Sequence, residues 1–334
     1  MGITYEILGG PGQDNAVLAR IDTGQGILRC LFDCGEGCVN GLAFAEVQQI
    51  DHLLFSHLHM DHIGGFDSFF RATFNRPDPV SVWGPPETSR ILHHRFQGFL
   101  WNLVEGQPGT WYVHDVYPDR QVALRFEAGE AFATAHPAGV RAGGGPIIST
   151  PALTIEAMAL DHATPSLGYL LREPPRANLD LAALARLGLR PGPWIQALKA
   201  PADPAATLEI DGVTHSQPAL REQLVVETPG DSLAYLTDFC LDEGAAERLA
   251  AWLQGCGTII CESQYRAADA ELARRNFHMT APAAAELARR ANAGQLVLFH
   301  LSNRYRRPEW AEMLTEARAV FPPTVFADHW AIEV

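Results

Sequence analysis

Short apolar runs separated by turn residues, together with longer amphipathic stretches, make up most of the hydrophobic pattern of this chain. Apolar runs of about four to eight residues between turn residues are typical of buried strands, and longer periodic segments are typical of helices. We therefore expect strands at residues 3–8, 16–21, 27–32, 53–56, 80–83, 153–160, 168–172, 232–236, 258–262 and 296–300. We expect helices at residues 41–49, 64–74, 86–100, 179–187, 244–254, 268–276, 281–291 and 308–320.

Two segments depart from this regular order. Residues 101–150 contain a Gly143-Gly144-Gly145-Pro146 stretch and other glycines, which predict irregular surface excursions. Residues 173–222 are interrupted by Pro174-Pro175 and Pro191-Gly192-Pro193, and they predict an inserted arm with one small helix rather than a sheet. The rest of the pattern predicts a single α/β domain over residues 1–334, with sheets inside and helices outside.

The charge of the chain narrows its function only in part. The 334 residues carry a formal charge of −14, and Lys199 is the only lysine. Strong acidity disfavours non-specific binding of nucleic acid, but it leaves room for a local basic patch or for an anionic substrate held by metal. No signal peptide and no apolar run of about 18 residues is visible, so we expect a cytoplasmic protein without membrane contact. Its six cysteines are then expected to be reduced.

The segment Ser56-His57-Leu58-His59-Met60-Asp61-His62 holds the most distinctive chemistry in the sequence. It follows the apolar run 53–55, and the end of a buried strand is where an α/β fold places a site, so we expect the segment to be a loop. Three imidazoles and one carboxylate crowded into six positions favour a bound cation. These ligands suit zinc, with manganese or iron possible.

Three later strands also end in potential ligands. Asp161-His162, Thr237-Asp238 and His300 each follow an expected strand. One such residue alone is usually structural, but three of them downstream of a metal cluster predict further ligands. By contrast, Cys30, Cys34 and Cys38 lack the matched short-spaced pairs of a zinc site.

Together these motifs resemble the metallo-β-lactamase fold, and within it ribonuclease Z, the tRNA 3′-processing endonuclease. The order and rough spacing of the motifs hold from about residue 5 to residue 330. The stretches that carry the resemblance are Phe32-Asp33-Cys34-Gly35-Glu36, His57 to His62, Asp161-His162 with Pro165-Ser166-Leu167-Gly168-Tyr169, Thr237-Asp238, Glu262-Ser263-Gln264-Tyr265, His278-Met279-Thr280-Ala281 and Phe299-His300-Leu301-Ser302-Asn303-Arg304-Tyr305. The insertion 173–222 is similar in position to the arm with which ribonuclease Z grips the tRNA elbow, and Pro191-Gly192-Pro193-Trp194 is similar to its Gly-Pro motif.

The resemblance implies an αββα sandwich with an inserted arm and two zinc ions per subunit. One zinc would take His57, His59 and His162, the other would take Asp61, His62 and His300, and Asp238 would bridge them. Two metal ions so placed activate water for in-line attack on phosphorus.

The resemblance also assigns roles around the metals. Asp61 would orient the water or accept its proton. Glu262 and His278 would deliver a proton to the leaving oxygen, since a carboxylate raises the pKa of a neighbouring imidazole. Asp33 would orient a ligand histidine. Arg304 and Arg306 would contact substrate phosphate. The family further suggests a homodimer in which the arm of one subunit binds RNA for the site of the other.

The arm keeps the choice of substrate open. Between residues 172 and 215 there are five basic and five acidic residues, so this stretch offers little net attraction to phosphates. One interpretation is removal of tRNA 3′ trailers, and another is hydrolysis of a smaller phosphodiester or other small ester.

Two other classes of protein fit the sequence less well. A non-catalytic RNA-binding scaffold is disfavoured by the complete ligand set. A redox di-iron protein is disfavoured by His59, where such proteins favour a carboxylate, and by the lack of a flavin domain. The other histidines are expected to be core or surface residues: His52, His93, His94, His114, His136, His215 and His329.

Overall fold

The computed structural model describes residues 2–200 and 203–332. Within these residues the chain divides into two compact units. One unit, which we call the body, contains the residues up to Arg172 and from Asp231 onward. The other unit, which we call the arm, is the insertion Glu173–Gly230. Arg172 and Ser232 are register partners in neighbouring antiparallel strands of the body, so the arm is inserted between two paired strand ends.

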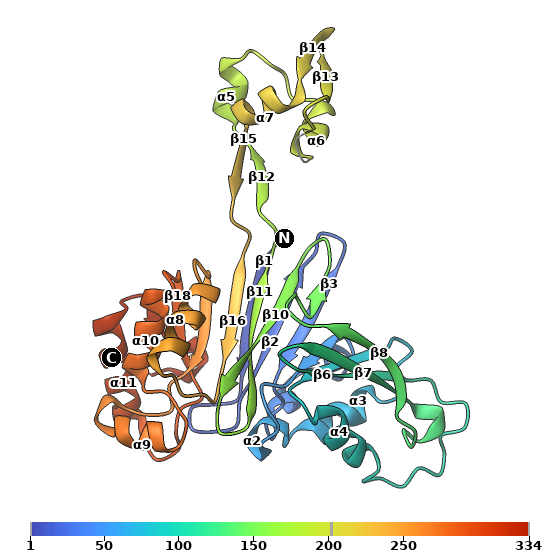
Figure 1. Ribbon diagram of the computed structural model, residues 1–334, viewed down its shortest axis with the longest axis vertical. Helices are drawn as coiled ribbons and strands as arrows, with labels where there is room; N and C mark the ends of the chain where they lie inside the picture. The colour runs from blue at the N-terminus through green and yellow to red at the C-terminus, as the bar shows by residue number, and fades with distance from the viewer. Residues whose placement is uncertain (1, 201–202, 333–334) are drawn as a thin grey trace. The chain divides into compact units, whose positions relative to one another are not determined.

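The first sheet of the body contains, among the described residues, eight strands in sequence order (Figure 1). Its central strands β3 to β6 are parallel, and the pairs toward both edges are antiparallel. The strands are β1 (Gly2–Leu8), β2 (Ala16–Asp22), β3 (Ile27–Phe32), β4 (His52–Leu54), β5 (Val80–Gly84), β6 (Thr110–Val116), β7 (Arg120–Glu127) and β8 (His136–Ala142).

The second sheet of the body has the order β19-β18-β17-β16-β11-β10-β9 in the described part of the chain. Strands β16 to β19 are parallel, and β9, β10 and β11 join them through antiparallel pairs. The strands are β9 (Ile148–Ser149), β10 (Thr154–Asp161), β11 (Pro165–Arg172), β16 (Ser232–Leu236), β17 (Thr258–Glu262), β18 (Gln295–Phe299) and β19 (Thr324–Val325).

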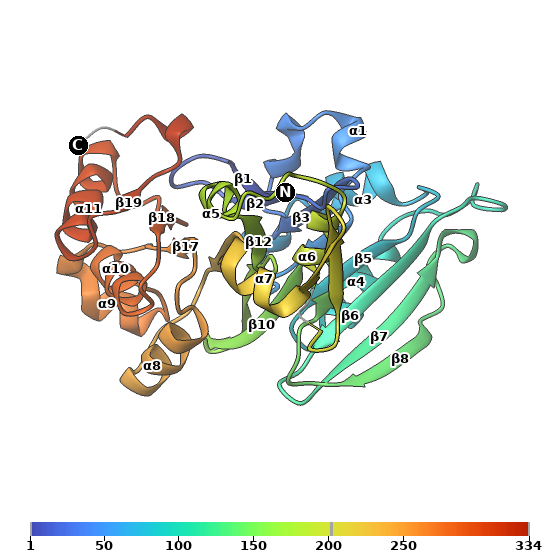
Figure 2. The ribbon, with the colours of Figure 1, turned by 90° about the horizontal axis from the view of Figure 1, so that it is seen from above.

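Helices cover the outer face of each sheet, which gives the predicted αββα layering. Phe66 and Phe96 of the helices on the first sheet pack against Trp111 of β6. The C-terminal helices pack on the second sheet and lie on the other side of the body (Figure 2). The two sheets meet face to face, where the rings of Phe32 and Tyr235 lie 5.3 Å apart. The helices of the body are α1 (Phe44–Val47), α2 (Met60–Ile63), α3 (Phe66–Thr73), α4 (Thr88–Phe96), α8 (Glu243–Trp252), α9 (Ala270–Arg275), α10 (Ala281–Arg290) and α11 (Arg307–Val320).

The order of strands and helices in the body agrees with the sequence prediction except for the short strand β19, which was not expected, and for two further regions. Residues 101–150 were expected to be irregular, but they contain β6, β7 and β8. The alternation of apolar and polar residues in β6 was not recognised, because Asp115 occupies one of its buried positions. The carboxylate of Asp115 accepts hydrogen bonds from Ser89. The metal-binding segment is also not wholly a loop, since Asp61 and His62 lie in the one-turn helix α2.

The arm contains strands as well as helices, so the expectation of no sheet is wrong. β12 (Arg176–Leu179) pairs with β15 (Val225–Thr228), and β13 (Thr207–Ile210) pairs with β14 (Val213–Ser216). Asp211 and Gly212 close the second hairpin with φ values of 51° and 80°, as a type I′ turn requires. Helices α5 (Leu181–Arg186), α6 (Trp194–Lys199) and α7 (Gln217–Leu224) enclose a separate small core of Ala183, Leu184, Leu198, Ile210, Leu220 and Leu224.

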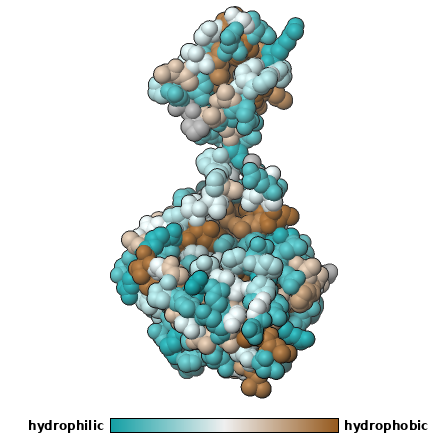
Figure 3. All heavy atoms as spheres, turned by 90° about the vertical axis from the view of Figure 1, so that its right-hand side faces the viewer, coloured by the Kyte–Doolittle hydropathy of each residue, from teal (hydrophilic) through white to brown (hydrophobic). Residues whose placement is uncertain are grey.

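The visible face of the body in Figure 3 is largely hydrophilic, with apolar patches between the polar side chains. The connection between α4 and β6 contributes exposed apolar side chains, namely Phe99, Leu100 and Leu103. Among the helices of the described residues, none combines the length and apolar character that crossing a membrane requires.

Candidate metal centre

The ends of parallel strands bring the candidate ligands to one edge of the sandwich. Asp33 follows β3 and His57 follows β4, and these two strands are parallel neighbours. In the second sheet, Asp238 follows β16 and His300 follows β18, which run parallel to β17 between them. The carboxyl ends of parallel strands are where α/β folds place ligand sites. His162 reaches the same edge from the turn between β10 and β11.

Three of these residues have a strained backbone. Asp33, Asp238 and His300 have φ values of 57°, 50° and 50°, in the left-handed region that residues with a side chain rarely adopt. Such strain costs about 1–3 kcal/mol for each residue and persists where the surrounding structure fixes it, often at functional sites.

The potential metal-ligating atoms form three groups, and all three contain Asp238. Two of them match the predicted ligand sets, namely His57, His59, His162 and Asp238, and Asp61, His62, Asp238 and His300, and the third is Asp238, Glu262, His278 and His300. Within each group the ligand atoms lie within 4.8 Å of one another. The structure therefore brings together all seven residues that the sequence proposed as ligands, and Asp238 belongs to both sets.

Asp238 lies close to four imidazoles. Its Oδ2 atom is 3.6 Å from Nε2 of His57, 3.4 Å from Nε2 of His62 and 3.5 Å from Nε2 of His162. Its Oδ1 atom is 3.1 Å from Nδ1 of His300. Asp61 approaches the second group, with Oδ2 at 3.4 Å from Nε2 of both His62 and His300. These separations leave the donor atoms facing a common centre.

A buried carboxylate supports two of the candidate ligand histidines. Asp33 is fully buried, and its Oδ2 atom accepts hydrogen bonds from His62 Nδ1, Ser56 Oγ and Tyr235 OH, each at 2.7 Å. Oδ1 accepts the backbone N–H of Ser56 at 2.7 Å. Because Ser56 gives its hydroxyl proton to Asp33, Oγ accepts from His57 Nδ1 at 3.1 Å. Both imidazoles thus carry their proton on Nδ1, and their Nε2 lone pairs face the centre.

The candidate ligands include buried nitrogen atoms that a metal ion would satisfy. Among the described residues, Nε2 of His57 and Nε2 of His62 are buried without a hydrogen-bond partner. Buried polar atoms are rarely left unpaired, so these two atoms need an explanation. Neutral imidazole nitrogens and carboxylate oxygens converging in this way are what zinc and related ions bind.

The electrostatics of the centre favour a cation. Burial lowers the pKa of His57 to about 2, with a further contribution from His62, so His57 is neutral at physiological pH. Burial opposes ionisation of Asp238, but His300 and His62 hold the pKa of this carboxyl well below its usual value. His62 is also buried, yet the charges of Asp238 and Asp33 raise its pKa. Asp238 and Asp33 thus place negative charge beside His62, and a bound metal cation would neutralise it.

Two other candidate ligand histidines are oriented by amide groups that the sequence analysis did not identify. His162 Nδ1 donates to the carbonyl of Phe277 at 2.8 Å, and Phe277 has a φ of 58°. Gln264 Nε2 lies 3.2 Å from Nδ1 of His300. The buried hydroxyl of Tyr235 was likewise missed, although a tyrosine within the apolar strand β16 was a signal that its hydroxyl has a partner.

A second carboxylate–histidine pair adjoins the two groups. Glu262 is fully buried at the end of β17, where Oε1 accepts the backbone N–H of Phe239 at 2.7 Å. Its Oε2 atom lies 3.1 Å from Nδ1 of His278. Burial alone would lower the pKa of His278, but the charge of Glu262 outweighs it and raises the pKa. A histidine with a raised pKa retains the proton that a general acid must donate.

The predicted phosphate-binding arginines lie outside the two ligand groups. The guanidinium of Arg304 lies 5.1 Å from the ring centroid of Tyr265, whose own ring is 5.9 Å from that of His278. Arg306 is the N-cap of α11 and donates to the carbonyl of Asn303 at 3.3 Å. Arg304 is thus linked to the Glu262–His278 pair through one aromatic ring, whereas the side chain of Arg306 is engaged with its own turn.

The four layers and the cluster at their edge define a protein of the metallo-β-lactamase fold. A model of the beta-lactamase superfamily domain matches residues 28–178. The short form of human tRNase Z has this fold too, with a TM-score of 0.52 at 17% identity, covering 91% of this chain and 94% of that one. The YhfI protein of Bacillus subtilis gives a TM-score of 0.57 at 15% identity, covering 98% and 96%.

Sequence comparison narrows the class to one family. The chain is 50% identical to ribonuclease Z of Deinococcus radiodurans, over 98% of each protein. It is 30% identical to ribonuclease Z of Synechococcus sp. strain WH7803, over 91% of this chain and 86% of that one. The chain belongs to the ribonuclease Z family, and the resemblance of its sequence motifs is confirmed.

Proposed function

We propose that this protein is a metal-dependent endoribonuclease that removes 3′ trailers from precursor tRNA. The observation that carries the proposal is the position of Asp238, which belongs to both predicted sets of candidate ligands. The Nε2 atoms of His57 and His62 face it and have no hydrogen-bond partner among the described residues. The identity to a ribonuclease Z over nearly the whole chain supports the choice of RNA as substrate.

The two groups of donor atoms would hold two zinc ions, or manganese or iron in their place. His57, His59 and His162 would bind one ion, Asp61, His62 and His300 would bind the other, and Asp238 would bind both. Metal ions at such a site activate water near neutral pH and neutralise charge on phosphoryl oxygens. Asp33 would keep the ligand histidines in the tautomer that binding requires.

The other residues of the site would handle protons. The P–O bond to the 3′ oxygen of the tRNA breaks when water attacks phosphorus in line, and the leaving oxygen needs a proton. His278, with its pKa raised by Glu262, would supply that proton. Asp61 would orient the attacking water or accept its proton, because its Oδ2 atom lies in the second group of candidate ligands, 3.4 Å from Nε2 of both His62 and His300.

Arginine side chains would bind the substrate phosphates that lie outside the metal centre. Arg304 is exposed and stacks on Tyr265 beside His278, so it is the stronger candidate. Arg306 would play a smaller part because its guanidinium already bonds Asn303. The planar guanidinium fork matches two phosphate oxygens at once.

The charge of the arm favours a second candidate, hydrolysis of a smaller phosphodiester. Residues 173–230 contain five basic and seven acidic residues, a formal charge of −2. A surface that grips RNA through phosphate contacts gains affinity from positive charge, and this arm lacks it. The arm would then act as a lid or a dimer contact, whereas the tRNA function needs it to bind by other means.

We further propose a cytoplasmic homodimer, as the family resemblance suggests. Light scattering on the purified protein measures its mass directly. A mass near that of one 36.5 kDa chain at micromolar concentration would contradict the dimer.

One comparison tests the proposed function. Zinc-loaded protein is incubated at near-physiological salt with a precursor tRNA that carries a 3′ trailer, and separately with bis(p-nitrophenyl) phosphate. Cleavage at the trailer junction, lost in His59→Ala and kept in His94→Ala, is the expected result. If the diester is hydrolysed but the trailer stays intact, the small-substrate function is correct instead.

A further inference from the structure

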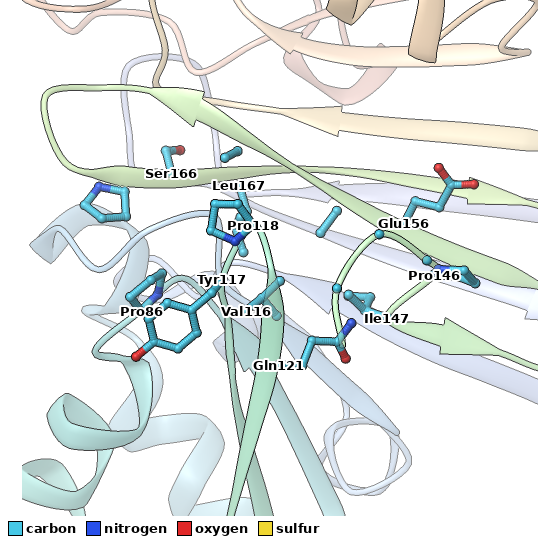
Figure 4. A pocket seen from close by; sticks show the side chains of 16 residues that line it. Pro86, Val116, Tyr117, Pro118, Gln121, Pro146, Ile147, Glu156, Ser166 and Leu167 are labelled. Atoms are coloured by element: carbon cyan, nitrogen blue, oxygen red, sulfur yellow. The ribbon is translucent and has the colours of Figure 1, made fainter. Parts of the chain in front are cut away.

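A cavity of about 490 Å³ lies within the body, in the size range of small-ligand sites (Figure 4). It is enclosed by the turn between β6 and β7, the glycine-rich loop after β8, and strands β10 and β11. The residues that matter for its chemistry are Pro86, Tyr117, Pro118, Gln121, Glu156 and Leu167.

The cavity adjoins the metal centre through shared backbone. Leu167 lines the cavity and donates its backbone N–H to the carbonyl of Ser56 at 2.8 Å, and Ser56 immediately precedes His57. Pro165 also lines the cavity and ends the turn that contains His162. A substrate phosphate at the metal centre would therefore place its adjacent nucleoside near the cavity.

Tyr117 forms an aromatic platform in the cavity wall. The guanidinium of Arg120 lies 4.2 Å from the centroid of its ring and covers one face. Pro86 and Pro118 add flat apolar rings, and Tyr117 and Pro86 lie toward the same end of the cavity in Figure 4. Aromatic and guanidinium planes of this kind are the surfaces on which unpaired bases stack.

The polar groups of the cavity argue for a base and against a phosphate. The side-chain oxygen of Gln121 accepts from Arg141 at 2.8 Å, and Glu156 accepts from the indole N–H of Trp252 at 2.8 Å. The carboxylate of Glu156 also repels an anion. The cavity therefore offers mainly stacking surface, with the hydroxyl of Ser166 as a small donor without a described partner, and this suits a base of any sequence.

We propose that this cavity receives the base of the first trailer nucleotide, stacked on Tyr117. The proposal rests on the proposed function and adds to it the position of the trailer. The trailer side is chosen because a single-stranded base can be splayed out, whereas bases of the acceptor stem are held in a duplex. The cavity would hold the trailer in place without reading its sequence.

The test is a cycle of two changes, one in the protein and one in the RNA. Precursor tRNAs are prepared with a normal or an abasic first trailer nucleotide, and kcat/KM is measured for wild type and Tyr117→Ala. Each change alone is expected to lower kcat/KM about 10-fold or more, the size of one base–aromatic stack. Both changes together are expected to cost no more than either alone. Tyr117→Phe keeps the ring and should behave as wild type.

Controls separate this proposal from the function on which it rests. Tyr112→Ala removes a tyrosine of β6, the strand that ends just before Tyr117. Tyr112 does not line the cavity, so this variant should leave the abasic effect unchanged. Zinc content and melting temperature show whether Tyr117→Ala remains folded. If wild type cuts the normal trailer and Tyr117→Ala cuts it equally well, or if the two losses multiply, the cavity proposal is wrong and the function stands. A wild type that leaves every trailer intact overturns both.

Discussion

Ser56 donates its backbone N–H to Oδ1 of Asp33 and its hydroxyl to Oδ2, both at 2.7 Å. Its oxygen in turn accepts from His57, while Asp33 accepts directly from His62. One buried carboxylate therefore orients a histidine in each of the two ligand groups. A substitution of Asp33 or of Ser56 should therefore disturb the orientation of histidines in both groups of candidate ligands.

Replacing Ser56 by alanine should weaken metal binding without unfolding the protein. The change removes the acceptor that fixes the His57 tautomer, and loss of such a supporting contact typically costs about 10–100-fold in metal affinity. Competition with a chromophoric zinc chelator measures the affinity. Ser166→Ala is the matched control, because Ser166 is equally buried and its hydroxyl has no described partner. Equal zinc affinity in the two variants would contradict the role of Ser56.

Replacing Tyr235 by phenylalanine should destabilise the protein. The change leaves Asp33 with one fewer donor in a fully buried setting, and an under-satisfied buried acceptor costs about 1–3 kcal/mol. Urea unfolding of metal-free protein measures this free energy. The half-buried Tyr112 gives a control, and Tyr112→Phe is expected to change stability by less than about 0.5 kcal/mol. If Tyr235→Phe leaves the free energy of unfolding unchanged, the prediction is wrong, and a water molecule takes the place of the lost hydroxyl.

The Glu262–His278 pair should accelerate cleavage more strongly when the leaving group is more basic. A ribose oxygen needs a proton as it leaves, whereas p-nitrophenolate leaves without one. His278→Gln is therefore expected to slow precursor tRNA cleavage by about 10²–10⁴-fold, and to slow bis(p-nitrophenyl) phosphate hydrolysis far less. His94→Gln, at an exposed histidine, serves as control. Equal losses on both substrates would show that His278 supports the metal centre rather than donating a proton.

Two histidines outside the site should make the fold sensitive to acid. Burial lowers the pKa of both His52 and His114 to about 4, and His114 stacks on Trp83 with ring centroids 3.7 Å apart. Imidazoles in the unfolded chain titrate near pH 6.5, so between about pH 6.5 and 4 the unfolded state binds more protons. Their contribution to stability is present above this window and is lost as the pH falls through it.

The slope of stability against pH tests this prediction. Each such imidazole adds up to about 1.4 kcal/mol per pH unit within the window. Urea unfolding of metal-free protein at pH 7, 5.5 and 4.5 should show a shallower slope for His114→Gln than for wild type. His94→Gln should keep the wild-type slope. An unchanged slope in His114→Gln would mean that this ring is already protonated in the folded state or stays accessible to water.

The sequence was sufficient to predict which candidate ligands come together, because those outside the segment 59–62 stand close to recognisable strand ends. His57, His162, Asp238 and His300 all follow apolar runs, and parallel strands carry such ends to one edge. The supporting contacts were not predictable in this way. Tyr235 and Asp33 are 202 positions apart and meet only because the two sheets pack face to face. The strands β6 to β8 were missed because polar side chains interrupt their alternation.

The register of Arg172 with Ser232 has a consequence for how this protein can be altered. The strands β11 and β16 would form an ordinary hairpin if a short turn joined them, and the whole insertion 173–230 takes the place of that turn. The insertion has its own hydrophobic core, so neither unit depends on the other for burial of apolar surface. The length, sequence and charge of the insertion can therefore change without repacking the sheets that carry the candidate metal centre.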